Sequence, residues 1–173
     1  MRWVRRLFGS GAPEGFVGAL EDDENVLGWA EVSGGGFLVA TSLGLWIPDD
    51  GARRIGWHLI SKATWGSGVL IVIEAREDDT VDGAVLLVDL PARRFVVEQP
   101  GSVPRVVQAR VTGSITSRHH HDLPGGGAWF VQRRVPGAGP VLQVRPDPGT
   151  DPEAVRRMAS EVAARIRAAR EVR

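Results

Sequence analysis

The chain has 173 residues, 43% of them hydrophobic, which is enough for one domain with a buried core and a short tail. Its 21 basic and 21 acidic residues give a formal net charge of zero, so no overall field attracts a nucleic acid, and we expect no nucleic-acid partner. The lack of cysteine excludes disulfides, thiolate metal sites and cysteine nucleophiles, and the only lysine, Lys62, lies outside any phosphate-binding loop motif.

Residues 1–23 are predicted to be a tail and a linker. The first eight could form a short helix with Trp3 and Phe8 on one side and Arg5 and Arg6 on the other, a pattern that suits a membrane surface. Eight residues bury too little area for stable anchoring, so we expect a tail that frays or packs on the domain. The alternative is peripheral membrane contact, which predicts co-sedimentation with liposomes that is lost when the tail is deleted.

Other membrane and export signals are weak. The N-terminus has no apolar run typical of a signal peptide, and no segment approaches the roughly 20 apolar residues that span a bilayer. We therefore expect a cytoplasmic protein with no integral membrane segment.

From residue 26 onward, short apolar segments alternate with turn residues, which is typical of antiparallel β-sheet. The acidic run of residues 21–24 before them is expected to be solvated. Residues 57–65 break the alternation and predict a helical turn or tight corner, whereas residues 76–83, with four acids, predict an exposed turn. The expected strands cover residues 26–32, 37–41, 43–47, 53–57, 69–73, 84–90, 95–98, 103–115, 129–135 and 141–145.

Residues 103–115 support two interpretations. A strand would place Val107, Ala109 and Val111 on one face, whereas a helix could span residues 104–110. The threonines that follow, together with Gly113, favour a strand. We therefore predict a strand here.

The clearest helix covers about residues 151–171. Thr150 or Asp151 is placed to cap it, and Pro152 suits its first position. Its apolar residues recur every three or four positions, so one stripe should dock on a sheet or a barrel mouth. The stripe consists of Val155, Met158, Ala159, Val162, Ile166 and Ala169.

Seven or more short antiparallel strands followed by one amphipathic helix resemble the pleckstrin-homology-like (PH-like) fold, a bent sheet or partly open barrel with the helix plugging one end. The local resemblance lies in residues 37–41 (FLVAT), residues 43–46 (LGLW) and the run Ile55, Gly56, Trp57 and Ile60. These look like the strand-turn-strand signature of bacterial PH-like domains and their GRAM relatives. The signature covers roughly residues 26–75, and the whole chain is similar to uncharacterised actinobacterial proteins. The resemblance implies one PH-like domain over residues 24–173, including the helix.

Inositide binding is not expected from this resemblance. PH-like domains that bind phosphoinositides place lysines and arginines in and beside the loop between the first two strands. Here that loop is residues 33–36, a serine and three glycines with no basic residue near it. A neutral loop cannot neutralise a phosphorylated headgroup.

The most conspicuous polar cluster is the triple histidine of residues 119–121. In a strand, His119 and His121 point to one side, and with Asp122 or His58 they could bind zinc or nickel. The competing interpretation is a polar hairpin end, which we favour because two histidines on a flexible rim bind metal weakly. His58 itself could be a general base, but we expect it to cover the hydrophobic corner at Trp57.

Tryptophans and arginines offer two further candidates. Most of the six tryptophans are expected in the core, whereas Trp46 and Trp65 are the candidates for ligand or partner contact. The arginine pairs at residues 53–54, 93–94 and 133–134 could converge on an anion, but alternation sends one of each pair to each face. We therefore expect them to form a solvated rim.

These observations favour a non-enzymatic interaction module that binds a protein or peptide through a groove beside the C-terminal helix, with no cofactor. The first alternative is a peripheral membrane protein that uses the N-terminal tail. The second is a metal-dependent enzyme at the triple histidine.

Overall fold

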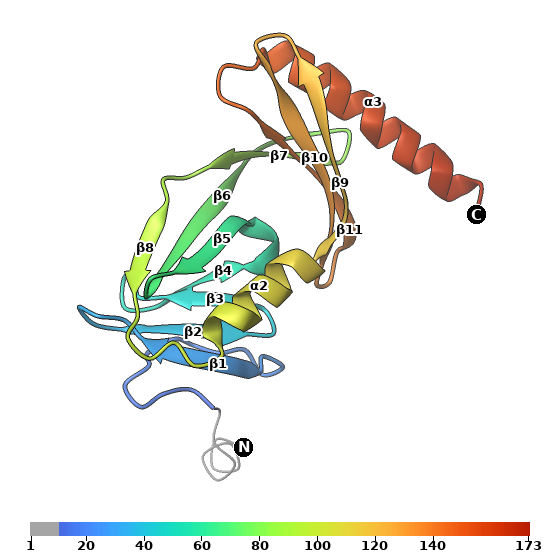
Figure 1. Ribbon diagram of the computed structural model, residues 1–173. Helices are drawn as coiled ribbons and strands as arrows, with labels where there is room; N and C mark the ends of the chain where they lie inside the picture. The colour runs from blue at the N-terminus through green and yellow to red at the C-terminus, as the bar shows by residue number, and fades with distance from the viewer. Residues whose placement is uncertain (1–10) are drawn as a thin grey trace. The chain divides into compact units, whose positions relative to one another are not determined.

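The computed structural model describes residues 11–173, which form a mainly β chain with an amphipathic C-terminal helix, as predicted (Figure 1). The chain divides into two compact units. The N-terminal unit comprises residues 11–74 and 91–112 of the described chain, and the C-terminal unit comprises residues 75–90 and 113–173. We describe each unit by itself.

The N-terminal unit holds a four-stranded antiparallel sheet and a group of three strands. The sheet has the order β1-β2-β3-β4, with β1 (Val26–Glu31), β2 (Phe37–Thr41), β3 (Gly44–Ile47) and β4 (Arg53–Gly56). The 3₁₀ helix η1 (Trp57–Leu59) leads into β5 (Ile60–Gly66). The first half of β6 (Val69–Val81) pairs with β5 on one side and with β8 (Arg93–Val96) on the other.

One core joins both groups of strands to the helix α2 (Val103–Gly113). Leu38, Leu45 and Ile60 are fully buried in this core. α2 contributes Val103, Val107 and Val111, which recur every four residues and so lie on one face of a helix. Burial of this face explains why the segment is helical.

The strand predicted over residues 103–115 is therefore wrong. Val107 and Val111 satisfy both a two-residue and a four-residue period, and the β-branched side chains biased the prediction towards strand. The four-residue valine repeat would have identified the helix, because burial of one helix face can outweigh the strand propensity of the individual residues. The helix ends at Gly113, and β9 (Ile115–Leu123) starts two residues later.

The predicted corner at residues 57–65 is right only in its first turn. η1 occupies three residues, and the rest of the segment is the strand β5. The buried Trp57 anchors the corner, since its indole Nε1 donates a hydrogen bond of 2.9 Å to the Thr41 carbonyl oxygen.

The predicted exposed turn at residues 76–83 is also wrong, because β6 continues as a strand to Val81. Its second half pairs with β7 (Ala84–Asp89), and the acidic side chains are solvated while their backbone groups hold the ladder. Only Asp82 and Gly83 form the turn, where both have positive φ angles of 49° and 86°.

The C-terminal unit is built on the second half of β6 and four further strands in the order β6-β7-β11-β10-β9. Two of these are β10 (Gly126–Val135) and β11 (Gly139–Pro146). β7 and β11 pair in parallel, and the other neighbours are antiparallel. β9 lies at the end of this order, so in the described part of the chain its outer edge has no strand partner.

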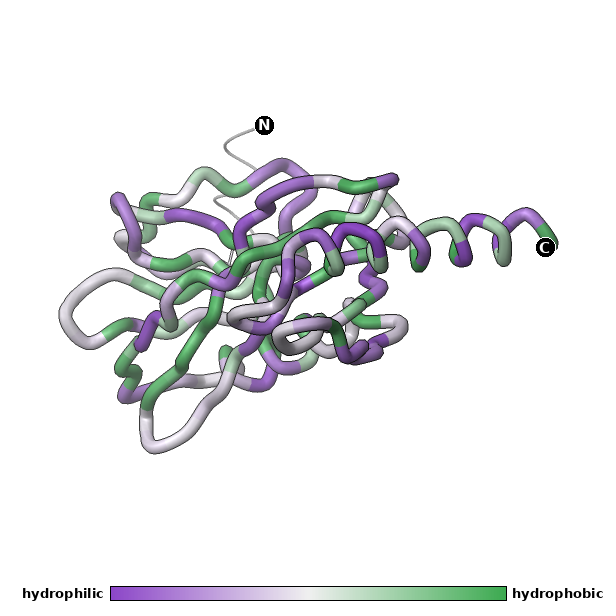
Figure 2. Tube along the Cα trace, turned by 90° about the horizontal axis from the view of Figure 1, so that it is seen from above, coloured by the Kyte–Doolittle hydropathy of each residue, from purple (hydrophilic) through white to green (hydrophobic). Residues whose placement is uncertain are grey.

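Helix α3 (Pro152–Glu171) packs chiefly on β7, β10 and β11. Asp151 caps its first turn by accepting a hydrogen bond of 3.3 Å from the Ala154 N–H, and Pro152 follows, as predicted. Val155 and Ala159 of the predicted stripe are buried, and together with the buried Ala163 they join one core with the sheet. Figure 2 shows apolar and polar residues alternating along α3 as expected for an amphipathic helix.

Candidate functional site

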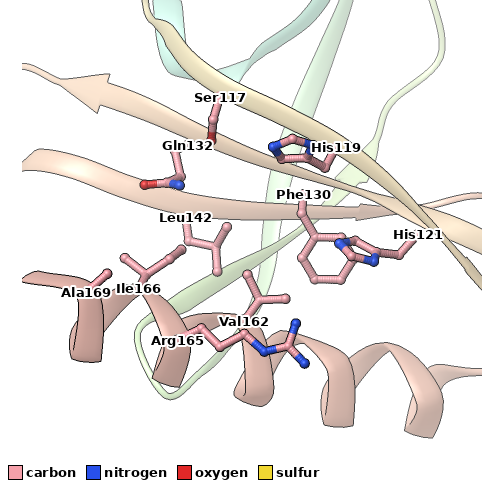
Figure 3. A pocket seen from close by; sticks show the side chains of 10 residues that line it. All are labelled: Ser117, His119, His121, Phe130, Gln132, Leu142, Val162, Arg165, Ile166 and Ala169. Carbon is pink, nitrogen blue, oxygen red and sulfur yellow. The ribbon is translucent and has the colours of Figure 1, made fainter.

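A groove of about 230 Å³ opens within the C-terminal unit, between the sheet and the second half of α3 (Figure 3). It lies beside the C-terminal helix, where the sequence predicted a binding groove. The lining residues are Ser117, His119 and His121 from β9, Phe130 and Gln132 from β10, Leu142 from β11, and Val162, Arg165, Ile166 and Ala169 from α3.

Two periodicities bring these side chains together. On β9, Ser117, His119 and His121 are alternate residues, so they share the sheet face that α3 covers. On the helix, Val162 and Ile166 are one turn apart and belong to the apolar stripe. The groove exists because this stripe extends past the buried Ala163, and helix residues beyond that point are only partly covered.

The floor of the groove is apolar. Phe130 is 3% exposed, and Leu142, Val162 and Ile166 surround it in the same hydrophobic cluster. The His121 ring stands edge-on to the Phe130 ring with 4.9 Å between centroids, which fixes the imidazole at the rim. An apolar group that entered here would be largely removed from water.

The rim of the groove carries basic side chains and neutral polar groups. Arg165, His119 and His121 supply the basic groups, and no carboxylate is among the ten lining residues. The Arg165 guanidinium lies 3.7 Å from a carboxylate oxygen of Glu161, but both side chains are mostly exposed. An exposed pair of this kind is weak, so Arg165 is available to an incoming anion.

The triple histidine is split between the two faces of β9. His119 and His121 line the groove, as predicted for one shared side. His120 lies on the opposite face, where its Nε2 is 2.7 Å from Asp147 Oδ2 and its ring is 5.0 Å from that of Trp129. In residues 11–173, no three histidine, aspartate or glutamate side chains gather closely enough to hold a metal ion.

His58 lies in η1 of the N-terminal unit. Its ring folds over Gly56, since a Cβ atom at that glycine would lie only 2.7 Å from His58 Cε1. This position agrees with a histidine that covers the hydrophobic corner.

The two candidate tryptophans lie in different environments, both in the N-terminal unit and outside the groove. Trp46 is only 8% exposed, and the Phe16 ring stands edge-on to it at 5.6 Å, so it has little surface left for a ligand. Trp65, on β5, is 39% exposed, and Trp29, on β1, is 44% exposed. Sequence reasoning missed Trp29 because strand alternation does not show which end of a strand is covered. Trp3, Arg5, Arg6 and Phe8 lie outside the described residues, so membrane contact by the tail stays a prediction.

Glu24 corrects the expectation that residues 21–24 are solvated. It is 5% exposed and lies at the centre of a polar cluster in the N-terminal unit. Its carboxylate accepts hydrogen bonds from Thr41 Oγ1 at 2.6 Å, Trp46 Nε1 at 2.8 Å, Arg54 NH1 at 2.7 Å and the Glu21 N–H at 3.0 Å. No local pattern distinguishes Glu24 from its acidic neighbours, because its partners lie on β2, β3 and β4.

This cluster predicts acid-sensitive stability. Burial raises the pKa of the Glu24 carboxyl, but the hydrogen bonds from Thr41, Glu21 and Trp46 and the charge of Arg54 outweigh it and hold the pKa below its usual 4.5. A carboxyl whose pKa is lower in the folded than in the unfolded state stabilises the fold at pH values above its unfolded-state pKa. This stabilisation is lost as the pH falls through the folded-state pKa. In urea titrations, the free energy of unfolding should therefore fall more steeply between about pH 5 and 3 for the wild type than for Glu24→Gln. Equal slopes would contradict a role for this carboxylate.

The arginine pairs were expected to form a solvated rim, and this is wrong for Arg133, whereas Arg53 and Arg54 are partly exposed and bound in ion pairs. Arg133 is 4% exposed, and burial together with the charges of Arg145 and Arg118 lowers its pKa to about 10. Arg53 binds both carboxylate oxygens of Glu74, at 2.8 and 2.9 Å. Arg54 reaches Glu24 and also Glu21, the latter at 2.7 Å. These three arginines therefore contribute to the structure of the unit in which each lies.

No family model, curated protein or solved structure matches this chain. In residues 11–173, neither helix combines the length and the apolar character needed to cross a bilayer.

Proposed function

We propose that the protein is a non-enzymatic binding module that takes a peptide segment of a partner protein into the groove. The observation that carries this proposal is an open groove with an apolar floor and a basic rim beside α3. Its volume of about 230 Å³ is below the roughly 300–1,000 Å³ of most small-molecule sites, which favours a side chain over a cofactor.

The chemistry of the lining also favours binding over catalysis. Ser117 and His119 are the closest approach to a nucleophile and base, but they are alternate residues on β9, and within residues 11–173 no hydrogen bond joins them. Turnover in a broad hydrolase screen that is abolished by changing His119 or His58 would contradict a non-enzymatic role.

We also infer that the N-terminal unit is a PH-like domain. Its four-stranded sheet, its three-stranded group β5-β6-β8 and α2 enclose one core, and residues 26–74 of the resembling segment lie in this unit. The helix that packs into this core is α2, whereas the sequence resemblance implied the C-terminal helix. The proposed groove accordingly belongs to the other unit.

Panning a library of random linear heptapeptides on phage over the immobilised protein tests the proposed function. We expect enriched clones whose binding falls about tenfold for Ala169→Trp, because the indole would fill the groove next to Ile166. Ala168→Trp is the matched control, since Ala168 is also exposed on α3 but does not line the groove. Enriched clones that bind both variants equally, or no enrichment at all, would contradict the proposal.

A further inference from the structure

We propose that the peptide binds as an added strand on the outer edge of β9 and places an apolar side chain and an acidic side chain, two residues apart, in the groove. This inference rests on the proposed function and specifies its ligand.

The open edge is β9, a nine-residue strand at the end of the sheet order. Its partner in the described chain is β10, so the backbone groups along its other side are free to pair with an extended segment. α3 packs chiefly on β7, β10 and β11, so β9 lies at the margin of the sheet face that the helix covers. Figure 3 shows Ser117, His119 and His121 on one side of the groove and α3 on the other.

Strand geometry then fixes the spacing of the ligand side chains. In an extended peptide every second residue points to the same face, about 7 Å apart. One such side chain would lie beside Ser117 and His119 at the mouth of the groove, with its tip toward Phe130 on the next strand, and the other would reach the basic rim. Adjacent residues point to opposite faces, so they cannot both enter the groove.

Charge selects the acidic partner. Arg165, His119 and His121 are the ionisable residues of the lining, and among residues 11–173 the carboxylate within ion-pair distance of Arg165 is that of the exposed Glu161. A carboxylate on the ligand would complement this rim.

Three blocked synthetic peptides with a fluorescent label test the inference by anisotropy. In the first, Thr-Thr-Leu-Thr-Glu-Thr-Thr, the leucine and glutamate are two residues apart. In the second, Thr-Thr-Leu-Glu-Thr-Thr-Thr, they are adjacent with the same composition. In the third, lysine replaces the glutamate of the first. We expect the first peptide to bind about five- to tenfold more tightly than the other two.

Matched variants identify the rim. Arg165→Glu should reduce binding of the first peptide to the level of the third, whereas Arg167→Glu, at an exposed position outside the groove, should leave it unchanged. Equal binding of the first two peptides, or no binding of any peptide up to about 1 mM, would overturn the inference.

The phage experiment distinguishes a failure of this ligand inference from a failure of the proposed binding function. Clones that depend on the groove but carry no acidic residue would refute the ligand class and leave the binding module standing. Clones indifferent to Ala169→Trp would refute the module. A dimer in light scattering that the first peptide does not dissociate would show that a second copy occupies the edge, and this too would overturn the inference.

Discussion

Glu24→Ala is expected to lower the free energy of unfolding by about 3 kcal/mol. The variant removes the carboxylate that accepts hydrogen bonds from Arg54, Trp46 and Thr41 together, so it leaves the buried Trp46 Nε1–H without this acceptor and the partly buried Arg54 with only the exposed Glu21 as its ion-pair partner among residues 11–173. Losing one partner of a buried pair costs more than the net worth of the pair, because the remaining charge stays desolvated. Urea denaturation followed by tryptophan fluorescence measures the change.

Asp23→Ala is the matched control, since it removes a neighbouring carboxylate from the same acidic run. Asp23 is exposed, so we expect its free energy of unfolding to stay within about 0.5 kcal/mol of the wild type. If the two alanine variants were equally stable, Glu24 would be as solvated as the sequence suggested, and the polar cluster would contribute nothing.

Val107→Asp is expected to lower the free energy of unfolding by more than about 4 kcal/mol, or to prevent folding. Val107 is 1% exposed and lies in the core of the N-terminal unit, where an ionised carboxylate would have no partner. Should this variant fail to fold, Val107→Ala should still fold with a loss of about 2 kcal/mol. Circular dichroism during thermal and urea unfolding measures both variants.

Ala109→Asp makes this experiment a test of secondary structure. In a strand, residues 107 and 109 would share a face, and aspartate at either position would be equally damaging. In the helix α2, Ala109 points away from the core and is exposed, so its aspartate variant should lose less than about 1 kcal/mol. Two variants of equal stability would contradict the helix.

The sequence predicted those elements whose local signals have a single interpretation. The cap and proline at Asp151 and Pro152 marked the start of α3, and the glycine-rich turn at residues 34–36 marked the end of β1 and the start of β2. The prediction for the α2 segment was wrong because valines at four-residue spacing also fit a two-residue period. The prediction for the second half of β6 was wrong because its charged residues suggested a loop. A strand pairs through its backbone, whatever its exposed side chains are.

The groove could be predicted only in part. The alternation of Ser117, His119 and His121 and the stripe of α3 were visible in the sequence. Phe130 and Arg165 were not recognised, because a periodic stripe looks the same whether a sheet covers all of it or only its first half. Nothing in the order of residues shows where along a helix the covering sheet ends.

The path of β6 has a consequence for how the chain is made. The N-terminal half of this one strand belongs to the first unit and its C-terminal half to the second, and β7 finds its parallel partner β11 much later in the chain. A ribosome would therefore release the β6–β7 hairpin while one edge of β7 is still open, and only the last third of translation would close it. The nascent chain would expose a strand edge throughout that interval, and its yield should respond to chaperones and to the rate of elongation.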